Sequence, residues 1–152
     1  MPTLATNKRA KFDYDLIHEF EGGLVLTGAE VKSAKKGHMS LQGSFLTVRK
    51  NELWLRNTHI GKYAPAGEQT DYNPTQDRKV LVHKAEIKKM IGKKDSQGLT
   101  IVPIRVYTKG SLVKIAFALA RGKRKYEKRD SIKKRDIEKR MKEEAKRTRF
   151  GS

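Results

Sequence analysis

The sequence predicts a mainly β protein, a small antiparallel OB-like barrel with two or three short helices and a basic C-terminal tail. Between residues 11 and 122, short runs of β-branched and aromatic residues alternate with polar positions, as antiparallel strands do. Two segments instead carry helix caps or apolar residues at helical spacing. Beyond residue 121 the chain is almost continuously charged. Barrels of this type commonly bind oligonucleotides, although a β-sandwich shows a similar pattern.

The first strands are predicted in residues 11–28. The run FDYDLIHEFEGGLVL contains aromatic and β-branched residues but no helical stripe. Its Gly22–Gly23 pair predicts a bulge or a sharp bend. A short helix should follow, because Thr27 can cap it, Glu30 comes three residues later and Gly37 can end it.

Residues 40–60 predict a β-hairpin. The strand FLTV leads into a turn at residues 50–52, and LWL leads out of it. We expect Phe45 and Trp54 in these strands to be core aromatics. Residues 62–78 contain two prolines and many turn-forming residues, which indicates a long surface loop.

The second half of the body predicts a strand, a helix and another hairpin. VLVHK, residues 80–84, is the strand. AEIKKMIGKKD, residues 85–95, is the helix, with Gly92 near its end. The hairpin follows, with Lys109–Gly110 in its turn, and Pro103 predicts an edge strand or a bulge.

The tail holds much of the charge and little that can be buried. Residues 121–150 contain fifteen Lys and Arg against six Asp and Glu, a net +9 that is half of the chain's +18. Ile137, Met141 and Ala145 form only a thin apolar stripe, and most helical stability comes from packing such a face. We therefore expect a tail that is disordered alone and helical when bound to a polyanion. The predicted domains are the barrel, 1–120, and the tail, 121–152.

The net charge of +18 points to a polyanionic partner, nucleic acid first and an anionic membrane surface second. The chain has no run of about 18 apolar residues, and its first residues lack the apolar segment of a signal peptide. With no Cys, disulfides and thiolate metal sites are excluded. A cytoplasmic location is the simple expectation.

No grouped set of catalytic residues is recognisable. The four histidines lack metal-ligand spacing, and the sequence has no nucleophile elbow, P-loop or dinucleotide glycine motif. Glu19 and Glu21 share one face of a strand, where both are more simply solvated than catalytic. We expect a binding protein and not an enzyme, with no cofactor and no metal.

Five stretches carry a resemblance to a known family. They are NKRAKFDY, FEGGLVLTGAEVKS, NPTQDRKVLV, GLTIVPIRVYTKG and KIAFALARGKRKYEKRDSIKKRD, in this order over nearly the whole chain. The most specific feature is GAEVKS followed much later by GKRKYEKRDSIKKRD. Together they resemble the small protein B (SmpB) family, the tmRNA-binding proteins of trans-translation.

The resemblance implies an OB-type barrel that binds the tRNA-like domain of tmRNA and fills in for its missing anticodon arm. Elongation factor Tu would carry the complex to the empty A site of a stalled bacterial ribosome. The tail would lie as a helix in the vacant mRNA channel, near the small-subunit decoding centre. No membrane and no DNA partner is expected. Composition alone leaves a structural ribosomal protein or a general RNA chaperone as the alternative.

The resemblance implies a tmRNA-binding role for charged and polar residues of the barrel, for one apolar residue and for three basic residues where the chain leaves the barrel. These residues are Asn7, Lys8, Arg9, Glu21, Glu30, Lys32, Arg78, Lys79, Leu81, Lys123, Arg124 and Lys125. Lys and Arg hold phosphates, and polar side chains can bond sugars or base edges.

Several of these residues have a structural alternative. Residues 7–9 could form a plain polar arm, and Glu21 could be a solvated strand residue. Glu30 could cap a helix or form a salt bridge, and Leu81 could lie in the core, as we expect for Val31. Residues 123–125 could be a solvated exit segment.

For the tail, the resemblance implies contact with the ribosome. The matching residues are Tyr126, Lys128, Arg129, Ile132, Lys133, Arg135 and Asp136. The sequence departs from the family pattern at Tyr126, where His is frequent, and at Glu127, where Asp is usual. Both a Tyr and a His ring can stack on a base, so a stacking role at position 126 can survive this difference. No role is assigned to residues 141–152.

Overall fold

The structure is a computed structural model of the 152-residue chain, and it describes residues 2–63, 71–123, 137 and 139–141. Two compact units are distinguished, residues 1–122 and residues 123–152. In the second unit, the described residues from Ile137 to Met141 are helical, and the side chains of these two residues are exposed. The expected disorder of the free tail stays a prediction.

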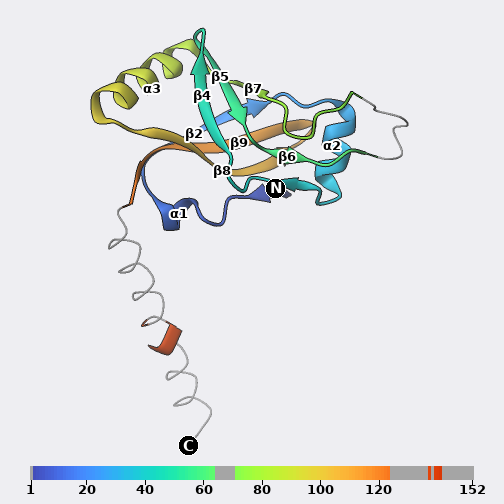
Figure 1. Cartoon of the computed structure of the whole chain (residues 1–152), viewed down its shortest axis with the longest axis horizontal. Coiled ribbons are helices and arrows are strands. Elements are labelled where there is room, and N and C mark those ends of the chain that lie inside the picture. The colour runs from blue at the N-terminus through green and yellow to red at the C-terminus, as the bar shows by residue number, and fades with distance from the viewer. Residues whose placement is uncertain (1, 64–70, 124–136, 138, 142–152) are drawn as a thin grey trace, which may run out of the picture. The chain divides into compact units, whose positions relative to one another are not determined.

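The first unit contains nine strands and three helices among the described residues (Figure 1). The strands are β1 (Thr3–Thr6), β2 (Tyr14–Leu24), β3 (Met39–Ser40), β4 (Phe45–Arg49), β5 (Glu52–Arg56), β6 (His59–Ile60), β7 (Arg78–Leu81), β8 (Thr100–Lys109) and β9 (Leu112–Gly122). The helices are α1 (Ala10–Asp13), α2 (Gly28–Lys35) and α3 (Lys84–Gln97). Figure 1 shows α2 and α3 at opposite ends of the strands.

The strands close into an antiparallel barrel in the order β8-β4-β5-β7-β2-β9, with β9 returning to β8. β1 adds to β8, and β3 pairs with β6 outside this ring. Alternate side chains point inward and form one core, which includes Leu46, Leu53, Leu55, Ile101, Ile115, Phe117 and Leu119. Burying each such side chain contributes about 1.5–3 kcal/mol. The predicted mainly β, antiparallel fold class is confirmed.

Both predicted hairpins form. The β4–β5 turn is one residue shorter than predicted, and the β8–β9 turn begins one residue later than predicted. The β4–β5 turn consists of Lys50 and Asn51, with φ of 53° and 61°. Positive φ at both positions is the geometry that two-residue hairpins prefer, so Glu52 belongs to β5. In the β8–β9 hairpin, Lys109 pairs with Leu112, so Lys109 lies in the strand and not in the turn.

Of the two alternatives predicted at Gly22–Gly23, the bulge is wrong, because the register of β2 shifts between Leu16 and His18 instead. The sharp bend stays a prediction. The glycines lie where β2 changes its pairing partner from β9 to β7. Gly23 pairs with Lys114 of β9 and also with Leu81 of β7. A Cβ on Gly22 would lie 2.8 Å from Cγ1 of Val80. Glycine is therefore required for strand approach at this junction.

Other element boundaries also differ from prediction. Residues 11–13 form part of α1 and not of a strand, and β7 begins at Arg78 rather than at residue 80. Helix α3 continues past Gly92 to Gln97, where Gly98 ends it with a φ of 62°. β1 was not predicted, because a four-residue strand gains its order from pairing with β8.

The aromatic residues of the β4–β5 hairpin lie outside the core. Leu53 and Leu55 take the inward positions of β5, so Trp54 between them points outward and is only partly buried. Phe45 is 38% exposed. The expectation that Phe45 is a core aromatic is wrong, because Leu46 occupies the inward position instead.

Helix α1 contacts β2 and β8. Val102 pairs with Ala118 on the face of the sheet opposite the main core, yet both are buried, as is Ala10 of α1. We infer that α1 covers this outer face. Its docking fixes the position of the basic residues that precede it.

Candidate nucleic-acid interface

Asn7 attaches the N-terminal arm, residues 2–9, to the barrel through hydrogen bonds. The β8–β9 register shifts between Pro103 and Arg105, which confirms the bulge predicted at Pro103. At this bulge the Asn7 backbone N–H donates to the Ile104 carbonyl at 2.7 Å. The Asn7 side-chain Nδ2 donates to the Pro103 carbonyl at 2.9 Å. Asn7 thus pairs two consecutive backbone carbonyls at the point where the β8–β9 register shifts.

Lys8 and Arg9 present their charges to solvent. Both residues are exposed, and the Arg9 side chain retains 67% of its accessible surface. Arg9 Nε lies 3.4 Å from Asp13 Oδ2, and its guanidinium carbon lies 4.9 Å from the Phe12 ring centroid. These contacts orient the guanidinium while most of the Arg9 side chain stays accessible, which suits a phosphate.

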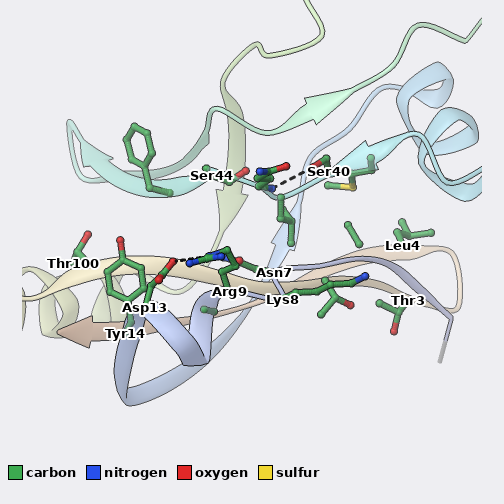
Figure 2. Close-up of a pocket in the computed structure, with 18 residues that line it drawn as sticks. Thr3, Leu4, Asn7, Lys8, Arg9, Asp13, Tyr14, Ser40, Ser44 and Thr100 are labelled. Atoms are coloured by element: carbon green, nitrogen blue, oxygen red, sulfur yellow. Dashed lines mark hydrogen bonds and ion pairs between the residues drawn. The ribbon is translucent and has the colours of Figure 1, made fainter. Parts of the chain in front are cut away.

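A groove of about 880 Å³ lies beside these residues, within the size range of ligand pockets. Residues 3–10, 13 and 14 form one wall, residues 39–45 form the other, and Thr100 contributes from β8. Figure 2 shows Asn7, Lys8 and Arg9 on one side of the groove and Ser40 and Ser44 on the other. The arm predicted to bind RNA therefore borders a cavity.

Glu21 lies on the outer face of β2 and is exposed. Its carboxylate accepts a hydrogen bond from the buried Tyr107 hydroxyl. Burial and the Glu21 carboxylate raise the pKa of Tyr107 to about 12, so the hydroxyl stays protonated. The Arg105 guanidinium carbon lies 4.4 Å from the Tyr107 ring centroid. Glu21 is thus a fixed acceptor beside an arginine, rather than a freely solvated residue.

Glu30 and Arg78 are buried together, each with 2% of its surface exposed. Arg78 donates to Glu30 Oε2 from Nη2 at 2.6 Å and from Nε at 2.9 Å. Arg78 Nη2 also donates to the Pro74 carbonyl at 2.9 Å. Glu30 completes the predicted capping box with Thr27. This ion pair joins α2, β7 and the end of the long loop, and it presents almost no surface to an RNA.

The pKa of Glu30 reflects two opposing effects. Burial alone would raise it. The Thr27 backbone N–H and the Arg78 guanidinium outweigh burial and leave the Glu30 pKa below its ordinary value. The carboxyl group is therefore ionised at neutral pH. Tyr72, whose hydroxyl donates to the Ile60 carbonyl at 2.8 Å, packs beside the pair.

Lys79 and Leu81 lie on the outer face of the barrel. Lys79 Nζ is 3.3 Å from Glu52 Oε1, and both side chains are partly exposed. Leu81 is 55% exposed, so the core alternative for this residue is wrong. The two side chains share one face of β7, so a basic side chain lies beside an exposed apolar one there.

The remaining barrel residue of the predicted set, Lys32, is exposed on α2. Its Nζ lies 5.8 Å from the Tyr63 ring centroid, and Lys36 Nζ lies 5.1 Å from the same ring. Val31 is only partly buried. Lys123 is described and partly buried, whereas residues 124–136, including every predicted tail contact, lie outside the described residues.

The structure brings Asn7, Lys8 and Arg9 together at the groove and places Glu21, Lys32 and the β7 pair on other parts of the barrel surface. The sequence reasoning did not find the second wall of the groove. No local signal identified it, because residues 40–60 were predicted as one hairpin and Phe45 as a core aromatic. In the described part of the chain, no cluster of three or more His, Asp or Glu could hold a metal. Nor is any described helix long and apolar enough to span a bilayer.

Comparison with known proteins shows similarity over most of the chain. A family model described as SmpB protein matches residues 4–147. The SsrA-binding protein of Trichodesmium erythraeum (strain IMS101) is 44% identical over 138 residues, which cover 91% of this chain and 88% of the relative. That of Sulfurihydrogenibium sp. (strain YO3AOP1) is 48% identical over 134 residues, 88% of each chain. A solved structure described as "tmRNA-SmpB: a journey to the center of the bacterial ribosome" matches with a TM-score of 0.66 at 36% identity, covering 87% of this chain and 95% of that chain.

Proposed function

The chain belongs to the SmpB family, and from this we propose that it binds the tRNA-like domain of tmRNA and delivers it to stalled ribosomes for trans-translation. The observation that carries the proposal is the family match over residues 4–147, which includes both the barrel and most of the basic tail. The relatives are named SsrA-binding proteins, and the structural neighbour is described with tmRNA and the bacterial ribosome.

The surroundings of each residue divide the proposed tmRNA contacts into two groups. Lys8, Arg9, Lys32, Lys79 and Leu81 are wholly or partly exposed and are proposed to touch the RNA. Glu21 is proposed to accept from a base amino group or to orient Arg105. Residues 123–125 are proposed to contact phosphates where the chain leaves the barrel.

Asn7, Glu30 and Arg78 are proposed to act on RNA binding through the fold. The Asn7 amide holds the arm. The Glu30–Arg78 pair holds the start of β7, which carries Lys79 and Leu81. Substituting any of these three residues would therefore displace neighbouring RNA contacts rather than remove one directly.

The tail is proposed as the ribosome-binding part, with the domains at 1–120 and 121–152. The residues from Tyr126 to Asp136 would enter the empty mRNA channel and become helical there, as phosphates neutralise their repulsion. Elongation factor Tu is proposed to join through the tmRNA complex. The protein would act in the bacterial cytoplasm, as a binding factor and not as an enzyme.

A pair of double variants tests this division of labour. Replacing Lys128 and Arg129 with Ala should leave the affinity for the tRNA-like domain nearly unchanged and abolish peptide tagging. Replacing Lys8 and Arg9 with Ala should weaken the affinity itself. The opposite pattern would contradict the proposal. Asn7 is left out of the second variant, because its hydrogen bond to Pro103 would confound binding with folding.

Sequencing the RNA that co-purifies with the full chain separates the proposal from its alternative. We expect enrichment of tmRNA and substoichiometric association with ribosomes. A structural ribosomal protein would instead be stoichiometric with ribosomes, and a general RNA chaperone would show no tmRNA enrichment.

A further inference from the structure

The second wall of the groove has no role in the function proposed above. We propose that this groove receives an unpaired nucleotide of the RNA partner, with its base against the Phe45 ring and its phosphate at Lys8 and Arg9. The inference rests on the proposed RNA-binding function and names the kind of RNA element that the arm recognises.

The groove follows from the way in which the barrel closes. One edge of β8 is shared by two strands, since β1 pairs with residues 105–107 and β4 pairs with Ile101. Between these pairings, Asn7 bonds the carbonyls of Pro103 and Ile104. The arm and the residues that lead into β4 therefore diverge from neighbouring points on one strand, and a cavity opens between them.

The wall opposite the arm is held by its own hydrogen bonds. The Asn57 side-chain Nδ2 donates to the Gly43 carbonyl at 3.0 Å, where Gly43 has a φ of 73°. The Thr58 hydroxyl donates to Ser44 Oγ at 2.8 Å, and the buried Ser44 donates to the Asn57 carbonyl at 3.2 Å. The groove is thus formed before any ligand binds, which lowers the entropic cost of binding.

The lining combines the groups that recognise an unpaired nucleotide. Two exposed cations, Lys8 and Arg9, lie along the arm. Across the groove, Gln42 offers an amide donor and acceptor and is exposed, and Phe45 offers a ring that is 38% exposed. The Arg56 guanidinium carbon lies 5.8 Å from the Phe45 ring centroid, and its Nε lies 3.3 Å from Asp77 Oδ1, so this arginine holds the ring rather than adding a free charge.

These groups favour unpaired RNA over a duplex. A stacking ring can act only on a base that has left its own stack, and a protein reads an A-form duplex mainly through its phosphates and sugars. A duplex would meet Lys8 and Arg9 at the rim and leave Phe45 and Gln42 unused. An unpaired base reaches the ring, and stacking on an aromatic side chain is tolerant of base identity.

Affinity measurements with the full chain test the proposal. The probes are a short single-stranded oligoribonucleotide, a blunt RNA duplex of similar charge and the tRNA-like domain of tmRNA, all at one salt concentration. We expect Phe45→Ala to weaken binding of the single strand and of the tRNA-like domain roughly 5- to 150-fold. Binding of the duplex should be unchanged, and Phe45→Tyr should restore the single-strand affinity.

Two controls separate stacking from other effects. Leu112→Ala removes an apolar side chain that is also exposed but lies at the β8–β9 turn, and it should change no affinity. The basic tail is expected to add charge-driven affinity for any RNA. Every variant therefore keeps the tail, and only differences in affinity between variants are interpreted. Thermal unfolding of each variant checks that Phe45→Ala still folds, and a 4-thiouridine cross-link in the single strand should map to residues 39–49.

The outcomes distinguish this inference from the proposed function. If the wild-type chain does not bind the tRNA-like domain, the proposed function fails. If the wild type binds it but folded Phe45→Ala binds all three RNAs as the wild type does, only the nucleotide site is overturned. Equal loss for duplex and single strand would also overturn it, because a ring that stacks on a base should not affect a duplex.

Discussion

Two arginine–carboxylate pairs of the barrel share one chemistry but lie in opposite surroundings. Arg9 and Asp13 are 3.4 Å apart with the arginine mostly exposed, whereas Arg78 and Glu30 are 2.6 Å apart and nearly inaccessible. An exposed pair contributes only about 0–1 kcal/mol to stability, while breaking a buried pair leaves a charge without compensation. The same residue type therefore stabilises the fold at position 78, whereas at position 9 it is proposed to bind RNA.

The largest expected effect comes from breaking the buried pair. Arg78→Ala removes the partner of a buried carboxylate and should lower the free energy of unfolding by about 3–5 kcal/mol. Urea unfolding followed by circular dichroism measures this loss. Arg121→Ala, at an exposed position of β9, is the matched control. It should change the free energy of unfolding by less than about 0.5 kcal/mol. A loss as small as that of the control would mean that the pair does not hold α2 to β7.

A smaller effect of the same pair should appear as the pH falls. The pKa of Glu30 is lower in the folded protein than its ordinary value. The contribution of Glu30 to the free energy of unfolding is therefore complete above the ordinary carboxyl pKa, and it is lost as the pH falls through the lowered pKa. The melting temperature should therefore drop in acid. Glu30→Gln should be less stable at neutral pH and should lack this part of the acid dependence. Parallel curves for the two proteins would contradict the assignment.

The smallest effect on stability is expected at the exposed pair. Arg9→Ala should change the free energy of unfolding by less than about 1 kcal/mol. Its affinity for RNA should nevertheless fall, and the slope of log K against log salt should shrink by about 0.7–0.9 for each phosphate that the variant no longer neutralises. Binding titrations over a salt series measure both quantities. Reduced stability with unchanged RNA affinity would reverse the roles of the two arginines.

Local patterns were sufficient for most of the fold. Strand alternation predicted both hairpins, Pro103 predicted the bulge, and Thr27 with Glu30 predicted the capping box. The failures involve contacts distant in sequence. The requirement for Gly22 comes from Val80 on β7, and β1 is a strand only because β8 lies beside it.

The candidate site was less accessible to sequence reasoning for the same reason. Resemblance identified Glu30 and Arg78, but their pairing joins positions 48 residues apart and no local signal indicates that both are buried. Phe45 was predicted as a core aromatic, and strand alternation alone does not say which face of the strand is inside. The groove became visible only when the arm and residues 39–45 were placed beside one another.

The arm described above also has a consequence for solubility. β1 occupies the edge of β8 at residues 105–107, and Asn7 bonds the two carbonyls that precede them. A chain trimmed before residue 8 would expose this row of backbone groups, and an open strand edge is a template for pairing with another chain. Residues 2–7 would thus protect this edge from pairing with a second chain. That role would restrict which substitutions they tolerate, independently of any contact with RNA.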